Sequence, residues 1–336
     1  MKKIGKNSVE FNHVYLRTSS AISGPKEAEG PLGQYFDASY KDNYCGGQNW
    51  EQAEIILQQH AIEAALSKSG LKMDEIDLAI GGDLNNQIAV TNYSLRAYDV
   101  AYLGVFSACS TCTQSMLLAA MLVDSGYGEN IMTITSSHNS TSERQFRYPT
   151  EYGGQKPTSM TSTATGAGAS IISSIPSSIR VTRATIGKII DPDLSDAQDM
   201  GRTMAPAAAT TFKTHLEDFQ IEPGEYDLIL TGDLSKYGSE IFLKILEEWQ
   251  IQTPENTNDA GLMLYDIEKQ NVFAGGSGCG CVTLVTLGYV VHALKTGKYN
   301  KVLIIATGAL MNPIMVAQNE SIPAIAHAIA LERSML

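Results

Sequence analysis

The chain has 336 residues, of which 43% are hydrophobic and 18% are charged, so it can bury a core and is not a disordered protein. Its formal net charge of −12 at pH 7 argues against nucleic acid as the main partner and against attraction to anionic lipid. The N-terminus has basic residues but no apolar run behind them, so we expect no secretory signal. Five cysteines, an odd number, suit a reducing compartment better than a disulfide framework.

Two long segments carry no Asp, Glu, Lys or Arg: residues 100–123 and residues 270–294. Uncharged segments of this length are typical of membrane spans. Here small polar residues at 107–115 interrupt the first segment, and a glycine-rich turn at 275–281 interrupts the second. A helix surrounded by protein can be apolar on every side. We therefore expect no transmembrane segment, and predict a short strand, a turn and a buried helix in each place.

These two segments occupy matching places in two halves of the chain. Residues 77–84 recur at 227–234, 150 positions later, and residues 131–134 match 302–305 at an offset of 171. Each half reads helix, strand, turn, buried helix, strand, and its apolar strands indicate a mainly parallel sheet covered on both faces. Either half alone would expose its uncharged helix, so the halves should dock face to face.

The sequence thus predicts an α/β fold of five layers, αβαβα, with two duplicated halves related by a pseudo-twofold axis. We place the halves at residues 1–180 and 181–336. The helices that begin near Cys109 and Cys281 should pack together in the middle layer.

A cluster of cations lies in the predicted loop from His138 to Lys156, against the negative total charge. The loop follows the predicted strand 131–135, so it leaves the carboxyl-terminal edge of a sheet, where such folds bind ligands. Arg144 and Arg147 suit a dicarboxylate, because each guanidinium can hold one carboxylate. The alternative is a solvated loop whose arginines pair with its own glutamates.

Cys109 lies where a strand is predicted to turn into the buried helix. A thiol near a helix N-terminus has a lowered pKa, so Cys109 could be a nucleophile or line an anion site. The alternative is a small buried hydrophobe. Cys109 with Cys112, and Cys279 with Cys281, form two close pairs, but the spacing between the pairs is unlike a zinc ribbon. We predict no metal and no cofactor.

Two aspartates, Asp83 and Asp233, end equivalent strands of the two halves. They could hold cations or orient loops. The simpler interpretation is that each accepts amide hydrogen bonds in a tight turn.

Several runs of sequence resemble known families. The duplicated halves, the Ser-Ala-Cys-Ser-Thr run at 107–111 and the run at 165–169 resemble the thiolase and ketoacyl synthase superfamily. Further runs along nearly the whole chain are similar to the stage V sporulation protein AD family: residues 24–33, 136–139, 143–157, 198–201, 204–209 and 273–279. This resemblance implies a role in spore-forming bacteria, in the membrane machinery that moves dipicolinic acid into the developing spore. It implies a soluble component, peripherally associated with the forespore or spore inner membrane, that binds this ligand.

Condensing enzymes of that superfamily pair a nucleophilic cysteine with His or Asn residues from the second half. Where synthases carry a histidine this chain has Asp233, and where the second His or Asn belongs it reads Gly-Gly-Ser-Gly-Cys at 275–279. Neither place offers an imidazole or an amide to activate a thiol or to hold an oxyanion. His327 could approach the same centre, but one histidine beside Cys109 is not a condensing set. We therefore predict a thiolase-like scaffold without catalysis.

Dipicolinate, the ligand that the resemblance implies, is a flat pyridine with two carboxylates, so its site needs cations, amides and a planar surface. The cationic loop and the helix start at Cys109 would supply the cations and amides. His138 could donate to a carboxylate or only cap the loop. The expected contacts are Cys109, His138, Arg144, Arg147, Gln155, Lys156 and Asp83, then Asp233 and His327, with Tyr148 or Tyr152 as the planar surface.

Three functions remain open at this point. The favoured one is a non-catalytic subunit that binds dipicolinic acid or its calcium chelate and works with other membrane proteins of the sporulation complex, in transport and germination. The alternative is a thiolase or ketoacyl synthase type of acyltransferase that uses Cys109 on a thioester. The third is a purely structural homodimer.

Overall fold

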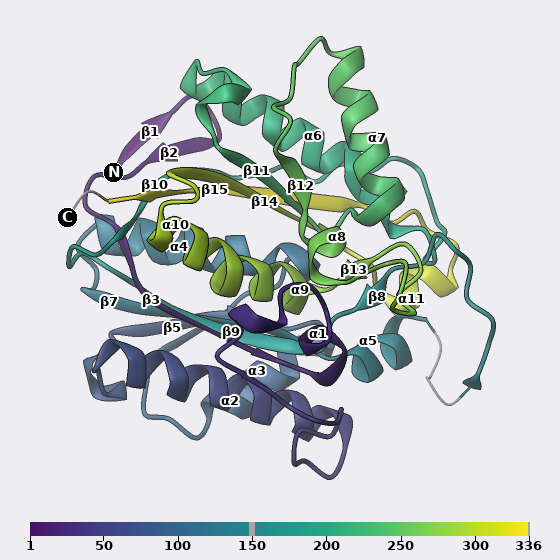
Figure 1. The fold of residues 1–336 in the computed structure, drawn as a ribbon, viewed down its shortest axis with the longest axis horizontal. Coiled ribbons are helices and arrows are strands. Elements are labelled where there is room, and N and C mark those ends of the chain that lie inside the picture. The colour runs from purple at the N-terminus through teal and green to yellow at the C-terminus, as the bar shows by residue number, and fades with distance from the viewer. Residues whose placement is uncertain (148–151, 335–336) are drawn as a thin grey trace.

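The computed structural model describes residues 1–147 and 152–334, and shows two sheets that separate three helical layers (Figure 1). The ten main strands pair in the order β12-β11-β14-β15-β10-β3-β9-β7-β5-β6, in which each half of the chain supplies five neighbours. β3 and β10 meet at a single register pair, Tyr15 with Arg180, so the two sheets join only at an edge. The predicted five-layer αβαβα fold is confirmed.

The two sheets have the same construction. The first contains β3 (Tyr15–Ser23), β9 (Gly166–Ser173), β7 (Asn130–Ser137), β5 (Leu78–Gly82) and β6 (Tyr102–Gly104). The second contains β10 (Ile179–Thr185), β15 (Ala324–Arg333), β14 (Lys301–Ala309), β11 (Leu228–Gly232) and β12 (Thr257–Asp259). In each sheet the last three strands are parallel, and the first two pair antiparallel. β9 is antiparallel to both β3 and β7, so β3 points the same way as β7, β5 and β6, and for the same reason β10 points the same way as β14, β11 and β12. The expectation of mainly parallel sheets is therefore confirmed in strand direction except for β9 and β15, because the apolar pattern of a strand buried on both faces does not specify its direction.

Helices from the two halves cover the outer faces at equivalent places. α2 (Trp50–Ser69) and α3 (Ala89–Leu95) cover the first sheet, and α6 (Met200–Phe219) and α7 (Ser235–Glu248) cover the second (Figure 1). α2 begins after Asn49, whose side chain accepts a hydrogen bond from the Gln52 amide, and α6 begins after Asp199, which accepts from the Arg202 amide. Both caps satisfy amides that the first helical turn leaves without partners.

The middle layer consists of the two uncharged helices, and both are buried. α4 (Thr111–Asp124) lies beside α9 (Cys279–Leu284), which continues through the π-helical turn Val285–Val290 into α10 (Val291–Thr296). The stretch Cys279–Thr296 is long and apolar enough to cross a membrane, but 83% of it is buried inside this protein. It is therefore a core helix here, as the sequence predicted.

Glycines in β9 allow α9 to approach the sheet closely. A Cβ at Gly168 would lie 2.5 Å from Thr283 Cγ2, and one at Gly166 would lie 2.5 Å from Leu284 Cδ1. The small-residue run at 165–169 is thus a packing surface for the middle layer.

The remaining elements lie around these layers. They are β1 (Lys2–Ile4), β2 (Ser8–Glu10), β4 (Ala38–Ser39), β8 (Ser162–Thr163), β13 (Gly276–Ser277), α1 (Pro25–Ala28), α5 (Asn139–Phe146), α8 (Ala260–Leu264) and α11 (Pro313–Ala317). β8 and β13 pair with each other in parallel and bring the two halves together near the end of α5. The predicted loop from His138 to Lys156 is therefore partly wrong, since Asn139–Phe146 form helix α5.

Candidate functional site

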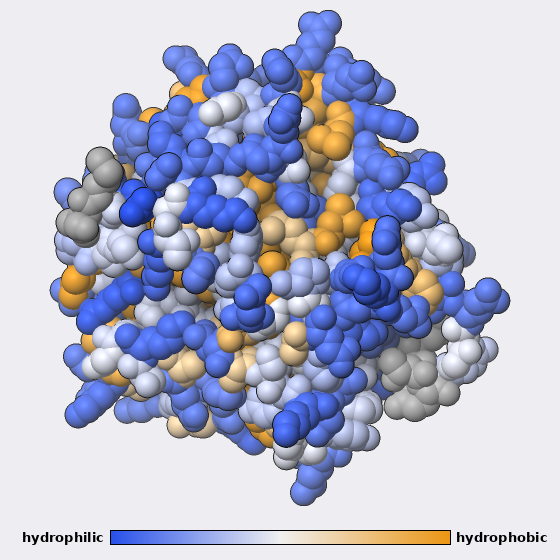
Figure 2. Space-filling model, in the orientation of Figure 1, coloured by the Kyte–Doolittle hydropathy of each residue, from blue (hydrophilic) through white to orange (hydrophobic). Residues whose placement is uncertain are grey.

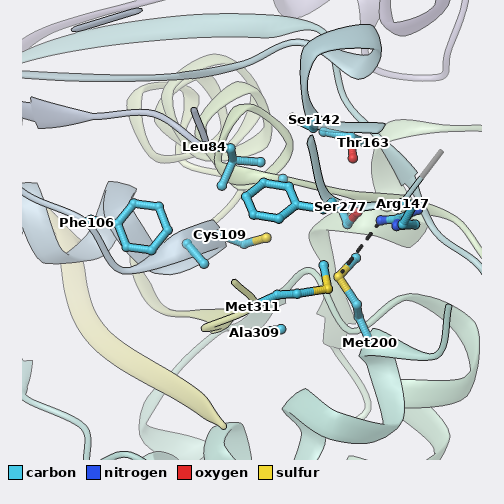
Figure 3. Close-up of a pocket in the computed structure, with 13 residues that line it drawn as sticks. Leu84, Phe106, Cys109, Ser142, Arg147, Thr163, Met200, Ser277, Ala309 and Met311 are labelled. Atoms are coloured by element: carbon cyan, nitrogen blue, oxygen red, sulfur yellow. Dashed lines mark hydrogen bonds between the residues drawn. The ribbon is translucent and has the colours of Figure 1, made fainter. Parts of the chain in front are cut away.

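A small cavity lies at the carboxyl-terminal ends of the parallel strands and receives side chains from both halves (Figure 3). Its volume is about 30 Å³. It is lined by Leu84, Phe106, Ala108, Cys109, Ser142, Phe146, Arg147, Thr163, Met200, Ser277, Gly278, Ala309 and Met311. We call it the Cys109 cavity. It occupies the region predicted for the ligand, between the start of the Cys109 helix and α5.

Arg147 is the cation of this cavity. Its Nη1 donates to Glu143 Oε1 at 3.1 Å and to the Thr161 carbonyl at 3.0 Å, and its Nη2 contacts Met200 Sδ at 3.9 Å. The side chain is 3% exposed, and its Nε has no hydrogen-bond partner among the described residues. A buried N–H without a partner costs free energy, so this group is poised to donate to an acceptor in the cavity.

Ser142, in α5, provides a second buried polar group without a hydrogen-bond partner among the described residues. Its Oγ is buried without a partner in the described part of the chain, and the residue lines the cavity beside Arg147. Two orphaned donors that face one cavity suit an anionic ligand, since a carboxylate oxygen can accept from both. Sequence reasoning missed Ser142 and Phe146. Their spacing of four residues could have identified them, because it places both on one face of a helix, whereas the sequence analysis predicted a loop here.

Cys109 lies in a short 3₁₀ turn, Ala108–Ser110, just before α4, and its sulfur points into the cavity (Figure 3). Burial raises the pKa of this thiol above its usual value, and the charge of Asp233 raises it further. A backbone hydrogen bond from Gly278 and the charge of Arg147 act in the opposite direction but are weaker. The expected lowering of the pKa by the helix N-terminus was therefore wrong, because desolvation of the thiolate outweighs the helix dipole.

The two equivalent aspartates have different surroundings. Asp83 accepts from the Asn85 amide at 2.8 Å and from the Thr91 amide and hydroxyl, both at 2.7 Å, as predicted for a turn. Neither oxygen of Asp233 has such a donor in the described residues, although the Cys109 and Cys281 thiols lie within hydrogen-bonding reach. Burial and the nearby charge of Asp259 raise the pKa of Asp233 well above its usual value. The expectation that Asp233 receives amide hydrogen bonds was wrong, because Asp259 accepts from the Leu234, Ser235 and Gly261 amides in its place.

The other predicted site residues lie outside the cavity lining. Lys156 is near it, with Nζ 3.4 Å from Glu143 Oε2, on the side of the carboxylate away from Arg147. Arg144 forms an exposed ion pair with Glu51, and Gln155 is exposed. Tyr152 is 72% exposed, and Tyr148 lies outside the described residues.

The two predicted histidines serve the scaffold. His138 Nε2 lies 2.7 Å from the Asn43 carbonyl and its Nδ1 accepts from the Ser140 amide, so it caps α5 and has no free nitrogen for a ligand. His327 Nδ1 accepts from the Gly187 amide, and burial lowers its pKa to about 4. His327 is not among the residues that line the Cys109 cavity.

A second, more open hollow adjoins the cavity. Its volume is about 200 Å³. It is lined by Leu84, Asn85, Asn86, Gln87, Phe106, Gln145, Phe146, Leu310, Met311 and Asn312. Four side chains line both spaces, which therefore adjoin: Leu84, Phe106, Phe146 and Met311. We call this second space the outer hollow.

The described residues contain neither a cluster of metal-ligating side chains nor a disulfide. Within residues 1–147 and 152–334, no group of three or more His, Cys, Asp or Glu side chains is arranged to hold a metal ion. All five cysteines are free thiols, and all are buried.

Comparison with known proteins identifies both fold and family. Solved structures with a similar fold include OleA of Xanthomonas campestris (TM-score 0.60, 13% identity, 96% of this chain and 99% of that one). A second is 3-oxoacyl-(acyl carrier protein) synthase III of Xanthomonas oryzae pv. oryzae (TM-score 0.59, 12% identity, 97% of this chain and 100% of that one). These likenesses establish a thiolase-like fold.

The sequence matches are more specific. Residues 5–332 match the family model of stage V sporulation protein AD. The stage V sporulation protein AD of Bacillus subtilis (strain 168) is 47% identical over 335 residues, which cover 99% of each chain. This chain therefore belongs to the stage V sporulation protein AD family and is a sporulation protein with a thiolase-like fold.

Proposed function

We propose that this protein is a non-catalytic subunit that binds dipicolinic acid, or its calcium chelate, for the sporulation machinery that loads it into the forespore. It would act as a soluble protein peripherally associated with the forespore or spore inner membrane, together with other membrane proteins of the same complex. Membership of the stage V sporulation protein AD family supports a role in sporulation. The Cys109 cavity, with its buried cation, supports the binding of an anionic ligand.

The observation that carries the proposal is the buried, orphaned donor at Arg147. The protein is acidic overall, with a net charge of −12, so an anion needs a local cation to overcome long-range repulsion. Arg147 Nε and Ser142 Oγ both lack protein partners and both line one cavity. Because Nη1 already holds Glu143 and the Thr161 carbonyl, we expect Arg147 to bind a carboxylate along its other edge, through Nε and Nη2, where Met200 Sδ is the only contact among the described residues.

The groups around Cys109 favour binding over catalysis. The raised pKa of its thiol leaves little thiolate at neutral pH, and thiolate is the nucleophilic form. The side chain at the position of the synthase histidine is Asp233, which is itself buried with a raised pKa. The acyltransferase remains the second candidate, because Cys109 points into a cavity and the structural neighbours include a synthase.

Calorimetric titration with dipicolinate, with and without calcium, tests the ligand. Arg147→Lys keeps a charge beside Glu143 but removes the Nε donor, so dipicolinate should bind roughly ten- to a hundredfold more weakly. Lys156→Ala should weaken binding less, since Lys156 acts through Glu143. Arg144→Ala is the matched control, because Arg144 pairs with Glu51 at the surface and should leave affinity unchanged. Normal binding by Arg147→Lys would place the ligand elsewhere.

Arg147→Ala is a poorer probe of ligand binding than Arg147→Lys. The side chains of Arg147 and Glu143 are 3% and 1% exposed, so deleting the guanidinium leaves a buried carboxylate with only Lys156 as a cation. Losing one partner of such a pair typically costs about 3–5 kcal/mol of stability. Arg147→Ala should therefore unfold at a lower temperature than the unmodified protein, which would confound a loss of affinity.

Exposure to a mass-tagged acyl-CoA tests the enzyme alternative. The binding proposal requires that Cys109 stays unlabelled and that no acyl-CoA is turned over. Turnover that disappears in Cys109→Ala would establish an acyltransferase instead.

A further inference from the structure

The outer hollow has the composition of a second binding subsite. Its polar side chains are all carboxamides, and no Asp, Glu, Lys or Arg lines it: the five are Asn85, Asn86, Gln87, Gln145 and Asn312. Such a wall can donate to an anion without neutralising it. Polar groups in a binding pocket fix the orientation of a ligand.

The sizes of the two spaces indicate how a ligand would divide between them. The Cys109 cavity, at about 30 Å³, holds about one water-sized group. One carboxylate end of a planar dianion can approach Arg147 Nε there, but an aromatic ring cannot follow. The ring and the far end must then lie in the adjoining outer hollow of about 200 Å³, which shares Leu84, Phe106, Phe146 and Met311 with the cavity.

Two of the five carboxamides, Gln145 and Asn85, hold the wall itself. Gln145 Oε1 accepts from the Asn86 amide at 3.0 Å, and its Nε2 donates to the Leu84 carbonyl at 2.9 Å, which ties α5 to the segment after β5. Asn85 Nδ2 donates to Glu54 Oε2 at 3.0 Å, so its donors face away from a ligand. These contacts fix the shape of the hollow.

The side-chain donors of Asn86, Gln87 and Asn312 have no partner among the described residues, and Asn312 is the one of the three whose oxygen is held in place. Its Oδ1 accepts from the Ile314 amide at 2.9 Å and from the Met315 amide at 3.3 Å, and so caps α11. This cap fixes which atom of the amide is the oxygen. Nδ2 then lies on a residue that lines the hollow, and it donates to no other described residue.

We infer that the outer hollow is a second subsite, in which Asn312 donates to the far carboxylate of a planar dianion whose near carboxylate is held by Arg147. Asn312 is thus the residue that distinguishes a dicarboxylate from a monocarboxylate. This inference rests on the proposed function and adds to it the mode of binding and the basis of selectivity.

Asn312→Asp tests the inference with little change in structure. Aspartate caps helices as well as asparagine does, so α11 should keep its start. The new carboxylate replaces the donor with a like charge, which repels the far carboxylate. We expect dipicolinate, titrated by calorimetry, to bind at least about tenfold more weakly. Picolinate, which lacks the second carboxylate, should change by less than about threefold.

Two further variants separate the possible failures. Asn49→Asp makes the same change at the cap of α2, away from the hollow, and should affect neither ligand. Arg147→Lys should weaken both ligands. If Arg147→Lys weakens both but Asn312→Asp weakens them equally or not at all, the second subsite is wrong and the proposed function stands. If Arg147→Lys affects neither ligand, or neither ligand binds the unmodified protein, both proposals fall.

Discussion

Asp83 and Asp233 end equivalent strands, yet their hydrogen-bonding surroundings differ. Asp83 has three donors within 2.8 Å, and their hydrogen bonds partly offset the rise of its pKa that burial causes. Asp233 faces two thiols and a second carboxylate, Asp259, and its raised pKa keeps it protonated over a wider pH range. A buried carboxylic acid beside Cys109 is compatible with a neutral site wall that does not repel an anion.

Replacing each aspartate by asparagine should therefore have different effects on stability. Asp83→Asn loses acceptors for Thr91 and should lower the free energy of unfolding by about 2–4 kcal/mol. Asp233→Asn removes a buried acid without losing an amide hydrogen bond, so it should be neutral or stabilising. Its advantage over the unmodified protein should grow as pH rises, because a carboxyl with a raised folded-state pKa destabilises the fold when it ionises. Urea unfolding at several pH values measures both effects, and an equal loss in the two variants would contradict this account.

At the scale of elements, Glu54 joins the walls of the candidate site. It lies in α2 and is fully buried, and Oε1 accepts from Ser136 Oγ at 2.7 Å. Its Oε2 accepts from Asn85 Nδ2 at 3.0 Å and from Thr141 Oγ1 at 3.1 Å. One carboxyl group thereby links α2 to β7, to the segment after β5 and to α5. The outer hollow keeps its shape partly through this link.

This carboxyl should also make the stability depend on pH. Burial, followed by the charge of Asp83, raises the pKa of Glu54 to about 8. The folded state therefore holds a proton that the unfolded state releases above its usual pKa of 4.5, so stability should fall as pH rises towards 8 and then level off. The slope from one such group is at most about 1.4 kcal/mol per pH unit.

Glu54→Gln isolates that contribution. The amide stays neutral at every pH, so the fall in unfolding free energy between about pH 5 and 8 should be smaller in the variant. Glu63→Gln, at an exposed position of the same helix, is the control and should keep the full slope. The interpretation fails if denaturant titrations give the same slope for all three proteins.

At the scale of the whole molecule, the two halves share one interior. A single core cluster contains Met116 of α4, Leu284 of α9 and strand residues of both sheets. Polar contacts also cross between the halves: Ser19 Oγ donates to the Leu287 carbonyl at 2.9 Å, and Tyr265 Oη donates to the buried carboxylate of Glu27. Neither half can bury its middle helix without the other.

The halves should consequently unfold together. We expect one cooperative transition, with the same midpoint by circular dichroism and by tyrosine fluorescence. A fragment of residues 1–180 would expose α4 and should be aggregated or lack a cooperative transition, since a large exposed apolar face promotes association. A monomeric fragment with a sharp transition would show that the first half is a domain by itself.

The sequence by itself determined the repeat, the layers and the family. The offsets of 150 and 171 align α2 with α6, β5 with β11 and β7 with β14, because hydrophobic periodicity and turn residues are local properties that survive duplication. The uncharged helices favour burial between the halves, since their apolar surfaces are unfavourable in water. The cationic segment and Cys109 could be named as a candidate site for the same local reason.

Only the tertiary structure decided what each of these residues does. Burial raises the pKa of Cys109. Asp259 accepts the amide hydrogen bonds that were expected for Asp233. Both ring nitrogens of His138 form hydrogen bonds with the backbone. Strand direction in β9 and β15, and the outer hollow at Asn312, depend on contacts between residues far apart in the chain. Desolvation and hydrogen-bond competition are set by such neighbours, and a sequence pattern records the residue types but not which of them meet.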